Sequence, residues 1–490
     1  MNPLDKIVEE RRKKINFFKK EGYPSYPSKI PTILPIAKVL HDFTRLLRNQ
    51  KKVTVAGRII GLRQQGGLIF VDLVDESGKI QILLQKKNLS NFDTLSKGLD
   101  IGDFIFLFGK VYTTKRKEKS LDAISSQIIT KSLRPLPSSW YGLKDVEERY
   151  RKRYLDLLLN QEVKDIFVKR TKIIEALREI LKQEGFSEFE TPILQSLAGG
   201  ATARPFKTHL NALNLDLYLR IAPELYLKRI LVGGFEKIFE LGRNFRNEGM
   251  DREHNPEFTM LELYWAYQDY EGLMNFVEKI FIKLLANLKI KQLFAKIPSK
   301  QNKKINLRRP WQKISFEKII KKYSGLDLNH SPDQEIKKFL NSNNVSFEKN
   351  LDKFELFDLI FKKIVRKNII DPLFIVDYPK EISPLAKSKE SQKNLTERFL
   401  LVIGGLELVN GFSELNDPLE QRERFKYQEK RRQAGNLEAS PFDEDFVEAL
   451  EYGMPPAAGL GLGVDRLVML LTEANSLREV ILFPLMRPKS

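Results

Sequence analysis

The chain has 490 residues, of which 42% are hydrophobic and 30% charged, and its formal net charge is +19. This length exceeds one ordinary domain and the composition is that of a folded protein, so we expect about two to four domains. The absence of cysteine excludes disulfides, thiolate zinc sites and a cysteine nucleophile. The positive charge favours polyanionic partners such as nucleic acid, although a general abundance of lysine explains it equally well.

Metal and membrane chemistry are also restricted. The histidines, His41, His209, His254 and His330, are too scattered for a histidine metal cluster, so any metal must be held mainly by oxygen. The N-terminal segment MNPLDKIVEERRKKINFFKK lacks the apolar stretch of a signal peptide, and no segment approaches ~20 apolar residues. We therefore expect a cytoplasmic protein that makes no use of a membrane.

The first half of the chain divides into three parts. Residues 1–50 begin with a helical pattern and then break at the proline-rich run YPSYPSKIPTILP, which favours an N-terminal extension rather than part of a core. Residues 51–133 contain short β-type runs (VTVAGRII, LIFVDLVD, KIQILLQ and DFIFLFGKVY) separated by turns with glycine, which predict a small β-barrel. Residues 134–148, which begin with RPLPSSWYGLKD, are predicted to be the linker.

Residues 149–490 mix amphipathic helices with strand signals and predict a second, larger domain. Apolar residues from Val163 to Ile180 share one helical face, which ends at Gly185. Residues 288–365 are rich in lysine and asparagine and have little long-range pattern, which predicts an insertion between two halves of this domain. The expected fold class is α+β.

The glycines near the C-terminus do not form a familiar nucleotide-binding loop. Gly459, Gly461 and Gly463 lie in AGLGLGVDR, which lacks the G-x-G-x-x-G spacing, and too few residues follow for a dinucleotide fold. The phosphate loop G-x-x-x-x-G-K-[ST] is absent as well. If ATP binds, side chains must hold it.

Residues 243–264, RNFRNEGMDREHNPEFTMLELY, concentrate the groups that could hold a nucleotide. Arginine binds phosphate or carboxylate with two parallel hydrogen bonds, His254 adds a donor, and Phe258 offers a flat face to a base. Taken alone, the block is also compatible with a solvated hairpin held by ordinary salt bridges.

This block resembles motif 2 of the class II aminoacyl-tRNA synthetases, and two further blocks agree. GFSEFETPIL, residues 185–194, resembles motif 1, whose proline (Pro192) lies at the dimer interface in that family. GLGLGVDRL, residues 459–467, resembles motif 3, whose arginine packs on adenine. The resemblance implies a homodimeric enzyme with a catalytic domain built on an antiparallel sheet flanked by helices.

Within this class the chain resembles the lysine-specific enzymes, through ARPFKTHLNALNLDLYLRIAPELYLKR, ELYWAY and NGFSELNDP. The resemblance implies that residues 51–133 are an OB-fold that binds the anticodon of tRNA(Lys), with Phe70 and Gln81 as contacts to the bases. It also separates the chain from a shorter paralogue that lysylates a translation factor and lacks such a barrel.

The resemblance implies a site that matches the three charged ends of L-lysine. Glu224 would hold the α-amino group, Arg246 would bridge the lysine carboxylate and the α-phosphate, and a buried acidic pair with Tyr264 would close on the side-chain ammonium. The implied lysine-binding residues are Gly200, Glu224, Arg246, Glu262, Tyr264, Asn410, Phe412, Glu414 and Gly461.

For ATP, the resemblance implies that Phe258 and Arg466 sandwich the adenine. Glu407 would bind Mg²⁺, and Arg246 and Arg466 would carry the catalytic charge. The implied ATP-binding residues are Arg246, Glu248, His254, Asn255, Phe258, Glu407 and Arg466. No covalent nucleophile is needed, since positioning and charge stabilisation perform the phosphoryl chemistry.

The chain departs from the family pattern at three places. Leu400 stands where related enzymes usually carry a metal-binding glutamate, which predicts weaker Mg²⁺ binding. Glu253 stands just before the motif 2 histidine, where bacterial relatives often have arginine. Ser125 falls where relatives carry an acidic residue that reads the anticodon, so anticodon discrimination is expected to be weaker.

Two alternatives remain at the level of sequence. An asparaginyl- or aspartyl-tRNA synthetase would need a cation facing its substrate, and the pair Glu262 and Glu414 favours lysine instead. A synthetase-like protein that binds RNA without forming an adenylate is supported by Leu400 and opposed by the otherwise complete set of arginines and glutamates.

Overall fold

The computed structural model describes residues 2–137, 143, 145–296, 302–348, 351–436 and 438–488. The chain divides into two compact units, Met1–Gly142 and Leu143–Ser490. The predicted linker at residues 134–148 falls partly outside the described residues. None of the described helices is long and apolar enough to cross a membrane.

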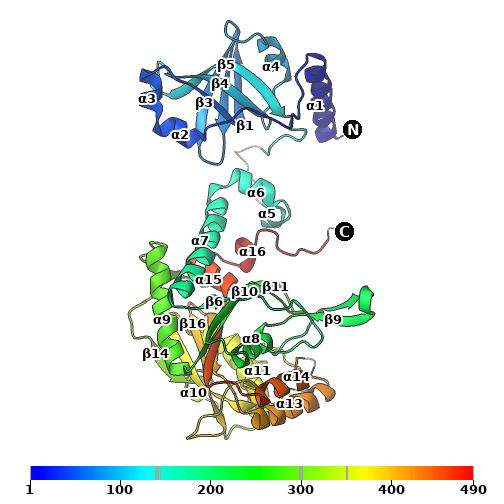
Figure 1. Ribbon diagram of the computed structural model, residues 1–490, viewed down its shortest axis with the longest axis vertical. Helices are drawn as coiled ribbons and strands as arrows, with labels where there is room; N and C mark the ends of the chain where they lie inside the picture. Colours follow the sequence, from blue (N-terminus) through cyan, green and yellow to red (C-terminus); the bar gives the residue numbers. More distant parts are fainter. Residues whose placement is uncertain are drawn as a thin grey trace. The chain divides into compact units, whose positions relative to one another are not determined.

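The first unit contains a closed five-stranded barrel, in which the strands follow the order β1-β2-β3-β5-β4 (Figure 1). Alternate side chains point inward: Ile69 and Val71 in one strand and Ile80 and Ile82 in the next are buried by 98% or more. Only β3 and β5 pair in parallel. The strands are β1 (Lys52–Gln65), β2 (Leu68–Val74), β3 (Lys79–Gln85), β4 (Phe104–Thr113) and β5 (Lys119–Thr130).

The N-terminal helices belong to this core, which corrects the expectation that residues 1–50 form an extension. Phe18, Ile36 and Phe43 join the hydrophobic cluster of the barrel. A Cβ added at Gly98 would lie 2.3 Å from Cζ of Phe18, so only glycine allows this ring to approach so closely. The helices are α1 (Pro3–Lys20), α2 (Ile36–His41), α3 (Phe43–Arg48) and α4 (Phe92–Gly98).

The second unit is built on an eight-stranded sheet in the order β14-β15-β16-β17-β18-β11-β10-β6. All neighbours are antiparallel except the outer pairs β14–β15 and β10–β6. The predicted α+β class is thereby confirmed. The strands are β6 (Ser187–Glu188), β10 (Lys237–Phe245), β11 (Glu257–Ala266), β14 (Gln312–Ser315), β15 (Leu373–Pro379), β16 (Leu395–Ile403), β17 (Leu406–Ser413) and β18 (Ala457–Gly463).

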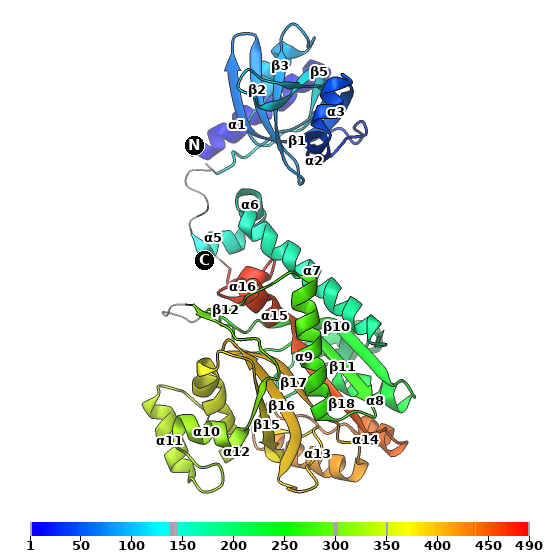
Figure 2. The same cartoon turned by 90° about the vertical axis from the view of Figure 1, so that its left-hand side faces the viewer.

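Helices cover one face of this sheet, and the opposite face carries the polar residues of the predicted site. In β11, Leu261 and Leu263 belong to the helix-covered core, whereas Glu262 alternates with them and points to the other face. Figure 2 shows α9 lying along the sheet. The helices that contribute to this core are α7 (Gln161–Gln183), α9 (Tyr270–Asn287), α15 (Val464–Leu471) and α16 (Leu477–Val480).

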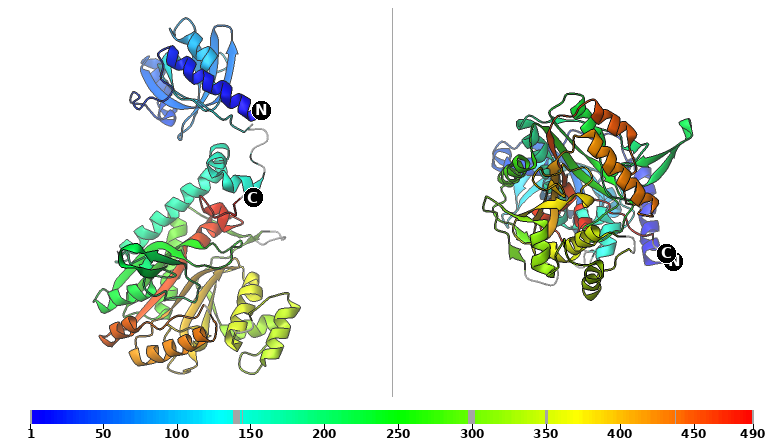
Figure 3. Two further views of the ribbon diagram at one scale, coloured as in Figure 1. Left: turned by 90° about the vertical axis from the view of Figure 1, so that its right-hand side faces the viewer. Right: turned by 90° about the horizontal axis from the view of Figure 1, so that it is seen from below.

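The described parts of the region predicted as an insertion, residues 288–296, 302–348 and 351–365, are folded into the unit. They supply β14 to the main sheet and a small helical layer, visible in yellow-green in Figure 3, with its own hydrophobic cluster around Phe316 and Phe357. Leu400 of β16 joins that cluster. The helical elements are α10 (Phe316–Ser324), α11 (Asp333–Ser342), α12 (Lys353–Ile360), a π-helical turn η2 (Phe361–Val365) and η3 (Arg366–Asn368).

The remaining elements of the second unit lie outside the main sheet. They are α5 (Val146–Arg151), α6 (Arg153–Leu159), β7 (Leu194–Gln195), β8 (Lys207–Leu210), η1 (Asn211–Leu213), β9 (Leu215–Leu219), α8 (Glu224–Val232), β12 (Phe294–Ala295), β13 (Lys303–Lys304), η4 (Lys380–Ile382), α13 (Pro418–Gln433) and α14 (Glu444–Glu451).

Candidate active site

Three carboxylates that lie far apart in the sequence are buried on the face of the sheet opposite α7, α9 and α15, where α8 and α14 pack. Glu224 begins α8, Glu262 lies in β11, and Glu414 follows the last residue of β17. Their exposed fractions are 7%, 4% and 1%. An unpaired buried carboxylate is costly, so such a cluster requires cations nearby, either from the protein or from a ligand.

One cation comes from the protein itself. Lys228 lies one helical turn after Glu224, and its ammonium Nζ is 2.7 Å from Oε1 of Glu224 and 2.5 Å from Oε2 of Glu414. Burial alone would lower the pKa of Lys228, but the two carboxylates raise that pKa above its usual value. Lys228 was not among the residues predicted from the sequence, although the spacing of four residues between Glu224 and Lys228 is a recognisable signal.

Glu262 has no cation of this kind beside it. Its carboxylate accepts a hydrogen bond of 3.0 Å from the hydroxyl of Tyr264. Burial, reinforced by the negative charge of Glu224, raises the pKa of Glu262 to about 8. Burial likewise raises the pKa of Glu414 to about 8. The site therefore holds fewer positive charges than its carboxylates can accept.

A cavity of about 350 Å³ opens over these groups. Among the described residues that line it, Glu224, Glu262 and Tyr264 are present but Glu414 is not. The carboxylate of Glu414, which is predicted to close on the ligand ammonium, forms an ion pair with Lys228. The other predicted lysine-site residues that line the cavity are Gly200, Arg246, Asn410, Phe412 and Gly461.

Glycines keep this cavity open. A Cβ at Gly461 would lie 2.5 Å from Cε of Met260, and one at Gly459 would lie 2.3 Å from Oε1 of Glu414. Gly200 has a φ of +86° and packs on Glu224, where an added Cβ would meet the Cβ of Glu224 at 3.0 Å. Larger residues at these positions would displace the side chains that line the cavity.

A second cavity, of about 250 Å³, lies on the same face and brings together every residue predicted to bind ATP. The guanidinium of Arg246 lies 5.1 Å from the centre of the Phe258 ring. Arg466 Nη2 is 3.0 Å from Nε2 of His254. The predicted residues lining the cavity are Arg246, Glu248, His254, Asn255, Phe258, Glu407 and Arg466.

The fit to a metal ion rests on Glu407. Its carboxylate is only loosely engaged, with Oε1 at 3.6 Å from Arg366 Nε and Oε2 at 3.8 Å from Arg466 Nη1, and Oε1 is buried without a hydrogen-bond partner. Within the described ranges, no group of three or more metal-ligating side chains gathers. Glu407 thus fits the role of a single protein ligand to an ion that takes its other ligands from water and phosphate.

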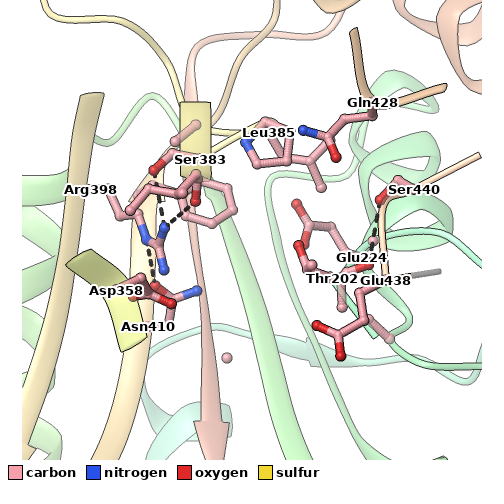
Figure 4. A pocket seen from close by; sticks show the side chains of 18 of the residues that line it. Thr202, Glu224, Asp358, Ser383, Leu385, Arg398, Asn410, Gln428, Glu438 and Ser440 are labelled. Carbon is pink, nitrogen blue, oxygen red and sulfur yellow. Dashed lines mark hydrogen bonds between the residues drawn. The ribbon is translucent and has the colours of Figure 1, made fainter. Parts of the chain in front are cut away.

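The two cavities share one wall. The described residues that line both are Arg246, Met260, Lys362, Arg398, Asn410 and Gly461. Figure 4 shows Arg398 and Asn410 on one side of the first cavity and Glu224 across from them. Arg398 and Lys362 were not predicted from the sequence, since only the fold brings β16 and η2 to this wall.

The residues predicted to contact the anticodon lie on the outer face of the barrel. Phe70 in β2 is half-buried, and Gln81 in β3 is 8% exposed, with its Oε1 accepting a hydrogen bond of 3.3 Å from Ser120. Gln81 pairs with Asp72, two residues beyond Phe70, so both side chains share one surface. Ser125 in β5 is exposed.

Comparison with known proteins agrees with this geometry. Residues 145–487 match the class II tRNA synthetases (D, K and N), and residues 53–129 match the OB-fold nucleic acid binding domain family. The lysine–tRNA ligase of Carboxydothermus hydrogenoformans is 47% identical, covering 99% of each chain. That of Clostridium tetani is 46% identical, over 99% of this chain and 97% of its own length.

Similarity extends to an archaeal relative. The lysine–tRNA ligase 2 of Methanosarcina mazei is 46% identical, over 97% of this chain and 93% of its own length. The synthetase match covers well over half of the chain and contains the three motifs, and the OB-fold match at residues 53–129 lies within the predicted barrel of residues 51–133. The chain therefore belongs to the class II tRNA synthetases of the D, K and N group, with an OB-fold nucleic acid binding domain ahead of its synthetase domain.

Proposed function

We propose that the chain is a lysine–tRNA ligase, which activates L-lysine with ATP and transfers it to the 3′ end of tRNA(Lys). The observation that carries this proposal is the buried carboxylate cluster of Glu224, Glu262 and Glu414, which has one internal ammonium, Lys228, and adjoins a second cavity lined by arginines. A ligand with two ammonium groups and one carboxylate supplies the missing charges.

Lysine is recognised by pairing each of its charges. Glu224, already bonded to Lys228, accepts the α-amino group, and Glu262 with Tyr264 accepts the side-chain ammonium. Glu414 contributes to that negative environment through its pair with Lys228. A neutral analogue would leave Glu262 without a partner and would be rejected. Arg246 takes the lysine carboxylate.

ATP occupies the second cavity. Phe258 and Arg466 enclose the adenine, while Glu248, His254 and Asn255 contact the base or the phosphates. The lysine carboxylate attacks the α-phosphorus in line, and pyrophosphate leaves. Arg246, which lines both cavities, binds the attacking carboxylate and the α-phosphate at once and so holds the two reactants in line.

Mg²⁺ enters with ATP, and Glu407 with its unpartnered Oε1 is the proposed protein ligand. The ion supplies positive charge to the phosphates when bound. Leu400 is 7% exposed and packed into an apolar cluster, so it adds no ligand. We expect a higher Mg²⁺ requirement than a site with two carboxylates has.

The barrel binds the anticodon of tRNA(Lys), with Phe70 stacking on a base and Gln81 offering its amide. The enzyme acts in the cytoplasm, as a homodimer whose interface includes the segment around Pro192. Within the predicted domain boundaries, residues 51–133 bind the anticodon and residues 149–490 catalyse the reaction.

ATP–pyrophosphate exchange with each of the twenty amino acids tests the proposal. We expect exchange with lysine alone. Exchange with aspartate or asparagine would instead favour another enzyme of the same group, and no exchange at any Mg²⁺ concentration would favour a protein that binds RNA without activating an amino acid.

A further inference from the structure

The wall shared by the two cavities contains three cationic side chains, of Arg246, Lys362 and Arg398. If lysine fills one cavity and ATP the other, as the proposed function requires, the reacting carboxylate and the phosphates meet at this wall. The cations of the wall therefore decide how much of the phosphate charge the protein itself can balance.

The guanidinium of Arg398 already donates hydrogen bonds within the protein. Its Nε donates to Oδ1 of Asn410 at 2.9 Å, and its Nη1 donates to the carbonyl oxygen of Ile382 at 2.7 Å. These bonds hold the guanidinium in place and orient Asn410, and among the described residues they leave only its Nη2 without a hydrogen-bond partner. Arg246 faces the ring of Phe258 and is needed by the lysine carboxylate.

Lys362 differs from both arginines. It lies on the π-helical turn η2, and its ammonium forms an ion pair of 2.7 Å with Asp358, one turn earlier on α12. Its side chain is 52% exposed although it lines both cavities. Asp358 is itself only partly exposed, but a flexible, exposed lysine with a single carboxylate partner can exchange that partner for a phosphate. Insertions of a π-helical turn often lie at functional sites.

The electrostatic surroundings keep Lys362 charged. Asp358 first, and Glu407 to a smaller degree, raise the pKa of Lys362 above its usual value. Of the acidic groups on the phosphate side, Glu253 forms an ion pair with Arg366, whose Nη1 lies 2.7 Å from its Oε2, and Glu407 is only loosely engaged by Arg366. An incoming triphosphate therefore meets an available ammonium at Lys362.

We propose that Lys362 binds the polyphosphate of ATP at the wall between the two cavities. Its ammonium turns from Asp358 to a phosphate oxygen, and the positive charge it brings is supplied by the protein and not by a metal ion. This inference rests on the proposed function for the presence of ATP. The opposing interpretation is that the Lys362–Asp358 pair only stabilises the turn between α12 and η2.

Measuring nucleotide binding in the absence of metal distinguishes phosphate binding by Lys362 from a purely structural role. Calorimetric titration in EDTA compares ATP with adenosine, for the wild type, Lys362→Met, Lys362→Arg and Lys363→Met. Lys363 is the matched control, because it is exposed in the same turn and is not among the described residues lining either cavity. We expect Lys362→Met to weaken ATP binding by about 10-fold or more, as for one lost hydrogen bond to a charged group. Adenosine binding stays unchanged, and Lys362→Arg retains most of the ATP affinity.

Three results would overturn the inference. ATP affinity in Lys362→Met equal to that of Lys363→Met would mean that Lys362 makes no phosphate contact. A parallel loss of ATP and adenosine affinity would mean that Lys362 only shapes the site. A wild-type protein that binds neither ligand would contradict the proposed function itself, and the inference with it.

Discussion

At the level of single residues, the selection of a charged ligand depends on Lys228. This residue is fully buried and is bound by Glu224 and Glu414. Replacing one member of a buried ion cluster leaves the others uncompensated, at a cost of about 3–5 kcal/mol. The helical spacing of Glu224 and Lys228 indicates that these two residues pair, but the contact of Glu414 with Lys228 could not be predicted, because it forms only when α8 and β17 come together in the fold.

The variant Lys228→Met should therefore lower the free energy of unfolding by about 3–5 kcal/mol at neutral pH, measured by urea titration of tryptophan fluorescence. The matched control is Lys279→Met, because Lys279 is 47% exposed and its pair with Glu184 is a surface ion pair worth roughly 0–1 kcal/mol. Equal losses in the two variants would contradict a buried charge cluster.

Lysine binding should depend on pH through Glu262. With its pKa near 8 in the empty site, Glu262 is mostly protonated at pH 6, and the ligand ammonium needs the ionised form. The KM for lysine should fall as pH rises from about 6 to 8 and level off above that, because binding below pH 8 must release the proton. Steady-state exchange kinetics measure this dependence.

The control for the pH dependence is Glu262→Gln, which cannot ionise. Its KM for lysine should be higher than that of the wild type and less dependent on pH, with the contributions of Glu224 and Glu414, whose pKa values burial also raises, remaining. A wild-type KM that does not change between pH 6 and 8 would show that Glu262 is already ionised in the empty site.

At the level of elements, period-two alternation predicts most of the site. In β11 it places Glu262 opposite the core leucines, and in β18 it places Gly461 beside Glu262 on the neighbouring strand. The residues implied by the motifs, apart from Glu414, line the two cavities, and their roles in binding lysine and ATP stay predictions. The alternation does not indicate which elements form the wall shared by the two cavities, so Lys362 and Arg398 could not be predicted.

The N-terminal segment shows where local patterns fail. Its apolar residues are separated by prolines and charges, so no continuous amphipathic face signals a core, yet Phe18 is fully buried. The same holds for residues 288–365, whose cluster forms only when helices from separate parts of that region pack on β16. In both segments, burial depends on contacts between residues far apart in the sequence, which a short stretch of sequence does not reveal.

The variant Phe18→Ala should destabilise the barrel by about 3–5 kcal/mol, because it removes a fully buried ring that fills the space over Gly98. Hydrogen exchange of the amides in β1 to β5 should accelerate accordingly. In Phe17→Ala, whose ring is only half-buried, the acceleration should be smaller. If both variants exchange at the wild-type rate, α1 is not part of the barrel core.

At the scale of the whole molecule, the proposed homodimer places the segment around Pro192 at the interface between two chains. The segment around Pro192 exposes apolar side chains, with Ile193 at 44% and Leu194 at 48%. Burial of such residues favours association. Sedimentation velocity should give twice the mass of one chain, and Ile193→Arg should shift the equilibrium towards monomer. A clean monomer with intact activity would contradict the homodimer.

The central claim is that the site makes lysyl-tRNA, and the most direct measurement is the transfer of labelled lysine to purified tRNA(Lys) in the presence of ATP and Mg²⁺. We expect acid-stable label on the tRNA, and its loss in Arg246→Ala, which removes the guanidinium lining both cavities. Binding of tRNA(Lys) by the wild type without any transfer of lysine would contradict the claim.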